Sequence, residues 1–244
     1  MLPQLDTPKY KLDLPSNGET IEYRPFLVKE EKILLLAMES MKEDNSDAIA
    51  SATFDIIKSC TFNNVKPESL PNFDLDYLFL NIRSRSRGEL IESAFVCQNE
   101  VDGEVCGTSN DVSVNINDIE VTFPEEDNSK VMITDEVGIQ FKYLTTAELQ
   151  YHDNEEDTIE KMFKVIVDSI DYVFDPEGVY KGSETSKAEL SEFVENLSED
   201  VFDKIKEYFK MQPQLRHTLD YKCSKCGYVE EVKLEGLEDF FGFA

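Results

Sequence analysis

The stretch Cys223-Ser224-Lys225-Cys226-Gly227 carries two thiols three positions apart. Thiolates at this spacing can point at one metal ion when the backbone curls into a knuckle, and the glycine that follows tolerates the positive φ that the curl requires. Residues 215–222 and 228–234, on either side, have the pattern of two β-strands. The sequence therefore predicts a metal-binding knuckle at the tip of a hairpin.

A second pair of thiols, Cys97 and Cys106, lies more than 100 residues earlier at the tip of another predicted hairpin, and Gly107 follows it. Two hairpin tips with two cysteines each are typical of a zinc ribbon. Nine positions separate Cys97 from Cys106, so the loop formed by residues 98–105 is expected to bulge out. We predict that the four cysteines hold one structural zinc ion, because four thiolates leave no coordination position open for catalysis.

Two other interpretations of these cysteines stay open, namely four inert thiols and a redox pair. A redox pair requires its motif to open a helix of a thioredoxin-like unit, whereas strands flank Cys223 and Cys226. The zinc site would join segments more than 100 residues apart, and its binding free energy, about 10–16 kcal/mol in small sites, would contribute to folding. Cys60, at the end of a predicted helix, is expected to be a core residue and not a ligand.

Away from the cysteines, the hydrophobic pattern alternates between helical and strand periods, which predicts an α+β fold. A turn at residues 15–18 indicates an N-terminal hairpin. The ranges expected to be helical are 28–43, 46–60, 73–87, 155–172, 185–196 and 198–211, with a short apolar helix at 237–241. The ranges expected to be strands are 89–96, 112–123, 131–133, 139–144, 215–222 and 228–234.

These ranges predict three regions. Residues 1–88 form an N-terminal hairpin and a helical head. Residues 89–145 and 213–244 together form a small antiparallel module that resembles a zinc ribbon, and residues 146–212 form a helical insertion between its halves.

The charge of the chain limits the partners that it can have. Acidic residues number 51 against 24 basic ones, which gives a net charge of −27. A duplex-binding surface needs clustered Lys and Arg, so this balance opposes nucleic-acid binding. The basic cluster Arg83, Arg85 and Arg87 is expected to cap a helix C-terminus or to meet an acidic partner. Acidity itself indicates either solubility or a basic partner surface.

The N-terminus, Met1-Leu2-Pro3-Gln4, lacks the basic and apolar regions of a signal peptide. No run of about 18 apolar residues occurs in the chain. Folding in the cytoplasm, where thiols stay reduced, is therefore expected.

Catalytic signals are weak. His152 and His217 are the two histidines, and lone histidines are more often surface or core residues than general acids or bases. Phosphate-binding glycine loops and the GxSxG, HExxH and EF-hand patterns do not occur. We therefore expect no catalytic residues and no enzyme.

Three stretches carry a resemblance to a known family. Residues 14–34, LPSNGETIEYRPFLVKEEKIL, resemble the opening of the T4-type phage baseplate hub subunit family. FDPEGVY at 174–180 and LRHT at 215–218, which leads to the Cys223 knuckle, look like the same family in marine T4-like phages.

The resemblance implies a late structural or assembly component of the baseplate hub of a contractile tail, which acts through contacts with other baseplate and tail hub proteins. It implies synthesis in the host cytoplasm and leaves two roles open, a permanent virion component and an assembly factor. The alternative hypothesis is a phage-encoded zinc-ribbon adaptor that binds nucleic acid or the transcription machinery. Phe240, Phe241 and Phe243 are candidates for a docking element or for the protein's own core.

Overall fold

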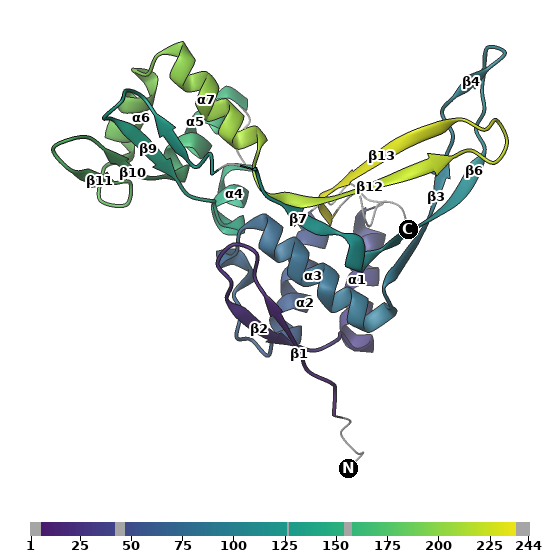
Figure 1. The fold of residues 1–244 in the computed structure, drawn as a ribbon. Helices are drawn as coiled ribbons and strands as arrows, with labels where there is room; N and C mark the ends of the chain where they lie inside the picture. The colour runs from purple at the N-terminus through teal and green to yellow at the C-terminus, as the bar shows by residue number, and fades with distance from the viewer. Residues whose placement is uncertain (1–5, 42–46, 126, 154–157, 238–244) are drawn as a thin grey trace. The chain divides into compact units, whose positions relative to one another are not determined.

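A computed structural model describes residues 6–41, 47–125, 127–153 and 158–237 (Figure 1). The chain is a mixture of helices and antiparallel sheets, which confirms the predicted α+β class. It divides into two compact units. Unit 1 consists of Met1–Pro67, Asn72–Thr122 and Gln214–Ala244, and unit 2 consists of Glu68–Pro71 and Phe123–Pro213. The 3-10 helix η1 (Pro67–Ser69) lies at the first change from one unit to the other.

The N-terminal part of unit 1 is a hairpin followed by three helices. Its elements are β1 (Tyr10–Asp13), β2 (Thr20–Tyr23), α1 (Val28–Met41), α2 (Asp47–Cys60) and α3 (Asn72–Arg87). The predicted turn between β1 and β2 is confirmed, and Gly18 takes a φ of 71° there. Ser16 in this turn donates its backbone N–H to the buried Asp74 carboxylate at 3.0 Å, and its hydroxyl donates to the same group. The turn is thereby fixed to the first turn of α3.

A buried ion pair fixes the entrance to α1. Arg24 donates to Glu30 at 2.8 Å, and both side chains are almost fully buried. Glu30 also accepts from the Ser59 hydroxyl at 2.6 Å and from the backbone N–H of Leu27 at 2.8 Å. The first turn of α1 is thus joined to the end of α2.

The second part of unit 1 is built from strands. Its elements are β3 (Leu90–Val96), β4 (Glu100–Val101), β5 (Glu104–Val105), β6 (Ser109–Asn115), η2 (Ile116–Asp118), β7 (Glu120–Thr122), β12 (Gln214–Lys222) and β13 (Val229–Glu235). β3 pairs with β6, β4 pairs with β5, and the third sheet has the order β13-β12-β7. The strand predicted over 112–123 is broken, because the Asn115 side chain accepts a hydrogen bond from the Asn117 N–H and starts η2.

One apolar core joins these strands to α3. Leu80 of α3 packs with Ile91 and Val114 from the β3–β6 hairpin. Leu215 of β12 and Leu234 of β13 complete this cluster. Residues of both hairpins that carry the cysteines therefore share one core cluster with Leu80 of α3.

Unit 2 has its own sheet and its own core. Its elements are β8 (Lys130–Met132), β9 (Gly138–Phe141), α4 (Thr146–Asp153), α5 (Thr158–Ser169), β10 (Ile170–Phe174), β11 (Val179–Lys181), α6 (Lys187–Glu195) and α7 (Glu199–Lys210). The sheet order is β11-β10-β9-β8, and Ile139, Ile166 and Ile205 lie in the core beneath it. The helix predicted to reach residue 172 ends at Ser169, because the next residues pair with both β9 and β11.

Some expectations fall on parts that the structure leaves undescribed. The short helix predicted over 237–241 lies almost entirely outside the described residues, as do Phe240, Phe241 and Phe243. The described helices include none that is long and apolar enough to cross a membrane.

Candidate metal centre

The strands of unit 1 bring four cysteines together at two hairpin tips. Cys97 directly follows β3, Cys106 follows β5, Cys223 follows β12, and Cys226 lies in the turn before β13. Their sulfur atoms all lie within 4.8 Å of one another, and this is the group of potential ligands found among the described residues. Cys97 and Cys223 are buried, and the other two are partly exposed.

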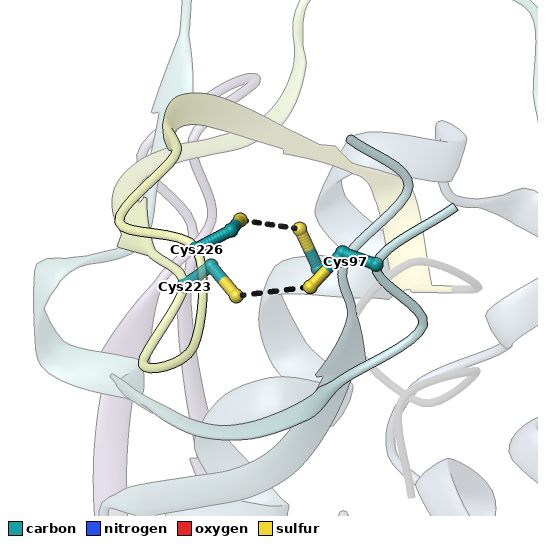
Figure 2. Close-up of side chains that lie close together, drawn as sticks. Cys97, Cys223 and Cys226 are labelled. Carbon is teal, nitrogen blue, oxygen red and sulfur yellow. Dashed lines mark hydrogen bonds between the residues drawn. The ribbon is translucent and has the colours of Figure 1, made fainter. Parts of the chain in front are cut away.

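The spacing of the sulfur atoms fits one tetrahedral ion. The Sγ atoms of Cys97 and Cys226 lie 3.7 Å apart, and those of Cys106 and Cys223 lie 3.8 Å apart. Zinc–sulfur bonds of about 2.3 Å give a tetrahedron whose edges are about 3.8 Å. Figure 2 shows the side chains of Cys97, Cys223 and Cys226 pointing toward one another across the gap between the hairpins. The donor set and its size therefore suit zinc, or an iron ion of similar coordination.

The knuckle that holds Cys223 and Cys226 comes later in the chain and is called the second knuckle. It is closed by two backbone hydrogen bonds. The N–H of Gly227 donates to the carbonyl of Cys223 at 3.0 Å, and the N–H of Cys223 donates to the carbonyl of Tyr228 at 2.8 Å. Gly227 has a φ of 74°, in the left-handed region that glycine adopts at little cost.

The knuckle that holds Cys97 and Cys106, called the first knuckle, makes the same two kinds of backbone hydrogen bond although its cysteines are farther apart in the sequence. The N–H of Gly107 donates to the carbonyl of Cys97 at 3.0 Å, and the N–H of Cys97 donates to the carbonyl of Thr108 at 2.9 Å. Gly107 has a φ of 62°. Both pairs of cysteines are therefore held by the same backbone geometry, although nine positions separate one pair and three separate the other.

The extra residues of the first knuckle form a hairpin of their own. β4 pairs with β5 around Asp102 and Gly103, whose φ values of 54° and 85° are both positive, as in a type I′ turn. The backbone N–H of Cys106 donates to the carbonyl of Asn99 at 2.8 Å and closes the base of this hairpin. The bulging loop expected over 98–105 is thus a folded insertion of six residues, Glu100–Val105, in a knuckle of ordinary spacing.

The electrostatic surroundings of the four thiols differ. Backbone N–H groups of Cys226 and Lys225 hydrogen-bond to Cys223 and lower its pKa to about 5. Burial raises the pKa of Cys97 to about 11. A hydrogen bond with the Thr108 hydroxyl lowers the pKa of Cys106. The knuckle backbone thus favours a thiolate at Cys223, and a bound cation would favour thiolates at all four positions.

The structure adds two asparagines that the sequence analysis missed. Asn110 accepts the backbone N–H of Ser224 at 2.7 Å and donates to the Tyr221 hydroxyl at 2.7 Å. Its amide also lies 3.8 Å from the Cys223 sulfur. Asn99 Nδ2 lies 3.8 Å from the Cys226 sulfur. The sequence did contain a signal for Asn110: asparagine is depleted in β-strands, so an asparagine within a predicted strand region indicates a specific role for its side chain.

Cys60 and His217 lie away from the four cysteines of the candidate metal centre. Cys60 is fully buried at the end of α2, and burial raises its pKa to about 12. His217 lies on β12, with its Nδ1 3.3 Å from the carbonyl of Asp118. The side chain of His152 falls outside the described part of the chain.

The arginines at the end of α3 contact acidic and aromatic groups of their own unit. Arg85 lies 3.8 Å from Glu89 and stacks over the ring of Tyr10 at 5.0 Å. Arg87 forms an ion pair with Glu31 of α1. Arg85 and Arg87 thus each have a partner within unit 1.

A family model described as T4 bacteriophage base plate protein matches residues 7–242. The chain therefore belongs to this family, which confirms the resemblance to T4-type baseplate proteins. Searches of the curated proteins and of the solved structures found no match.

Proposed function

We propose that the chain is a structural or assembly component of the hub of a contractile-tail baseplate and acts through contacts with other baseplate proteins. The observation that carries the proposal is the family match over residues 7–242. The likeness of residues 14–34 to the hub subunit family narrows the proposal from the baseplate to its hub. On this proposal the chain is made in the host cytoplasm and meets its partners there.

We propose further that Cys97, Cys106, Cys223 and Cys226 hold one structural zinc ion in a module of the zinc-ribbon kind. The sulfur–sulfur distances of 3.7 and 3.8 Å and the two similar knuckles support this assignment. Four protein ligands would complete a tetrahedron and leave no position for a substrate, so the ion would act as a staple between the β3–β6 and β12–β13 hairpins.

Metal analysis tests the zinc assignment. Protein purified without added metal should contain one zinc ion per chain and absorb no visible light. A stoichiometric amount of iron with a visible thiolate-to-iron band would contradict zinc, while absence of any metal would contradict the staple.

Two measurements test the function. Mass spectrometry of purified virions, beside a pull-down of the tagged chain from infected cells, should recover hub proteins of the baseplate together with the chain. Retention of the purified chain on a DNA column at physiological salt, without copurifying tail proteins, would instead support the nucleic-acid adaptor and contradict the hub. The net charge of −27 leads us to expect no retention.

A further inference from the structure

The six-residue hairpin inserted in the first knuckle, Glu100–Val105, is here named the finger. The metal-binding geometry does not require it, because the second knuckle makes the same two backbone hydrogen bonds with no insertion. Excision of the finger would join Asn99 to Cys106 and restore the three-position spacing of Cys223 and Cys226. The finger therefore serves something other than the four sulfur atoms.

Both faces of the finger are exposed. Glu100 pairs with Val105 on one face, and Val101 pairs with Glu104 on the other. The two valines are 43% and 54% exposed. A hairpin with strands of two residues gains little stability by itself, so apolar side chains on both of its faces are poorly explained by folding. They suit a projection whose two sides are covered by a partner.

The finger is held in place before any partner arrives. Asp102 and Gly103 form a tight turn with both φ values positive, and the N–H of Cys106 closes the base on the Asn99 carbonyl. The Asn99 side chain reaches the sulfur of Cys226 in the opposite knuckle. A preorganised element loses less conformational entropy on binding than a flexible loop does.

The negative charge of the finger indicates that its partner is basic. Three of its six residues are acidic, and neither Lys nor Arg occurs between residues 88 and 129. A second copy of the chain also carries a net charge of −27 and would be repelled. We propose that the finger docks in a groove of another baseplate protein that has basic residues at its rim and apolar residues inside. This inference rests on the proposed function.

The test compares three variants with the parent chain during an infection. The first lacks residues 100–105, the second carries Glu100→Lys and Glu104→Lys, and the third is the control, with Glu230→Lys and Glu231→Lys on exposed positions of β13. The second and third variants change the net charge by the same amount. Zinc content, melting temperature and the amount of chain in purified baseplates are measured for each.

We expect all three variants to keep one zinc ion per chain and a melting temperature close to that of the parent. Incorporation into baseplates should fall at least about tenfold for the deletion and for the finger charge reversal, and it should stay near the parent level for the control. Loss of zinc from the deletion variant would overturn the inference, since the finger would then be part of the metal site. Parent-like incorporation of the first two variants, or an equal loss in the control, would overturn it as well.

The outcomes separate the two proposals. If the parent is present in baseplates and the finger variants are too, the finger inference fails while the proposed function stands. If the parent itself is absent from baseplates and from tail intermediates, both fail. A photo-crosslinking amino acid placed at position 105, in place of Val105, identifies the protein that contacts the finger. The crosslinked partner should be a basic segment of another tail protein. A crosslink to a second copy of the chain would overturn the choice of partner.

Discussion

Glu30 shows how a single buried carboxylate ties pH to stability. Burial by itself raises the pKa of Glu30, but hydrogen bonds from Arg24, Ser59 and the Leu27 N–H outweigh it and hold the pKa at about 2, against an ordinary value of 4.5. Because the folded-state pKa is lowered, the stabilisation is fully present above about pH 4.5 and is lost as the pH falls toward 2.

We expect Glu30 to contribute on the order of 3 kcal/mol to the free energy of unfolding at neutral pH, and to lose this contribution between pH 4.5 and 2. Glu30→Gln should therefore destabilise the protein at pH 7, where it leaves Arg24 buried without its counter-charge, and the difference from the parent should shrink in acid. Urea unfolding of both proteins at a series of pH values measures this difference. Glu22→Gln is the control, since it removes an exposed ion pair with Lys9, and it should have a much smaller effect. A pH-independent difference for Glu30→Gln would contradict the lowered pKa.

Cys223 and Cys60 are both buried thiols, yet their substitution should differ in one measurement. On the proposed zinc assignment, Cys223→Ser should abolish zinc binding and lower the free energy of unfolding by at least about 3 kcal/mol, a fraction of the binding energy of such sites. Cys60→Ser should leave the zinc content unchanged, although an added hydroxyl in the core costs about 1–3 kcal/mol. Metal analysis and denaturation of each purified variant distinguish them. Zinc loss from Cys60→Ser, or unchanged stability of Cys223→Ser, would contradict the assigned ligands.

At the scale of elements, the knuckles depend on glycine for their backbone and not for space. An added Cβ at Gly227 meets no described atom within 4 Å, but its φ of 74° costs a residue with a side chain about 1–2 kcal/mol. Gly178, in the turn between β10 and β11, is equally open and lies outside the positive φ region.

Gly227→Ala should therefore destabilise the zinc-loaded protein by about 1–2 kcal/mol. Gly178→Ala is the matched control, and it should be neutral or stabilising by up to about 1 kcal/mol, because it reduces the freedom of the unfolded chain. Chemical denaturation at fixed zinc concentration measures both. An equal change in the free energy of unfolding for both variants would contradict the claim that Gly227 is needed for its left-handed backbone conformation.

The elements differ in how far the sequence predicts them. The helix predicted over 185–196 forms as α6, because its local signal is complete: Ser186 and Glu189 make a capping box at its start. The prediction is wrong at Ile170, because Ile170 continues the helical period of Ile166 and the sequence around it indicates a helix. Ile170 lies in a strand because it pairs with β9, a contact that is distant in the sequence. The finger was predictable in principle, since Asp102-Gly103 between alternating Glu and Val is a type I′ signal, but the cysteine spacing alone indicated a loop.

The candidate metal centre was predictable to a similar degree. Spacing and glycines selected the cysteines that the structure brings within 4.8 Å. The roles of Asn99 and Asn110 depend on how two hairpins face each other across more than 100 residues of chain, and no local pattern encodes that placement.

At the scale of the whole molecule, the segment 123–213, which forms most of unit 2, is inserted between two neighbouring strands of unit 1. β7 ends at Thr122 and β12 begins at Gln214, and these two residues are register partners in the ladder. The two ends of the segment 123–213 therefore lie beside each other, at the distance that a tight hairpin turn spans.

Replacement of residues 123–213 by Asn-Gly should give a shorter chain that still folds and binds one zinc ion, because the turn would join strands that are already paired. Circular dichroism, zinc content and a cooperative unfolding transition measure this. The same excision combined with Cys223→Ser is the control, and it should lose the metal. An excised chain that aggregates or binds no zinc would show that unit 1 needs unit 2 in order to fold.

Because the segment 123–213 separates two parts of unit 1 in the sequence, the two pairs of cysteines are synthesised at different times. Cys106 and Cys223 are 117 positions apart, and at 5–20 residues per second a ribosome needs roughly 6–23 s to cover that distance. The β3–β6 hairpin and its two thiols must wait through this interval, while the segment of unit 2 emerges and can begin to fold. A nascent chain that stops before Cys223 carries half of the sulfur atoms and lacks β13, so it cannot close its first unit. Unit 1 can therefore close only after residues 223–235 have been synthesised.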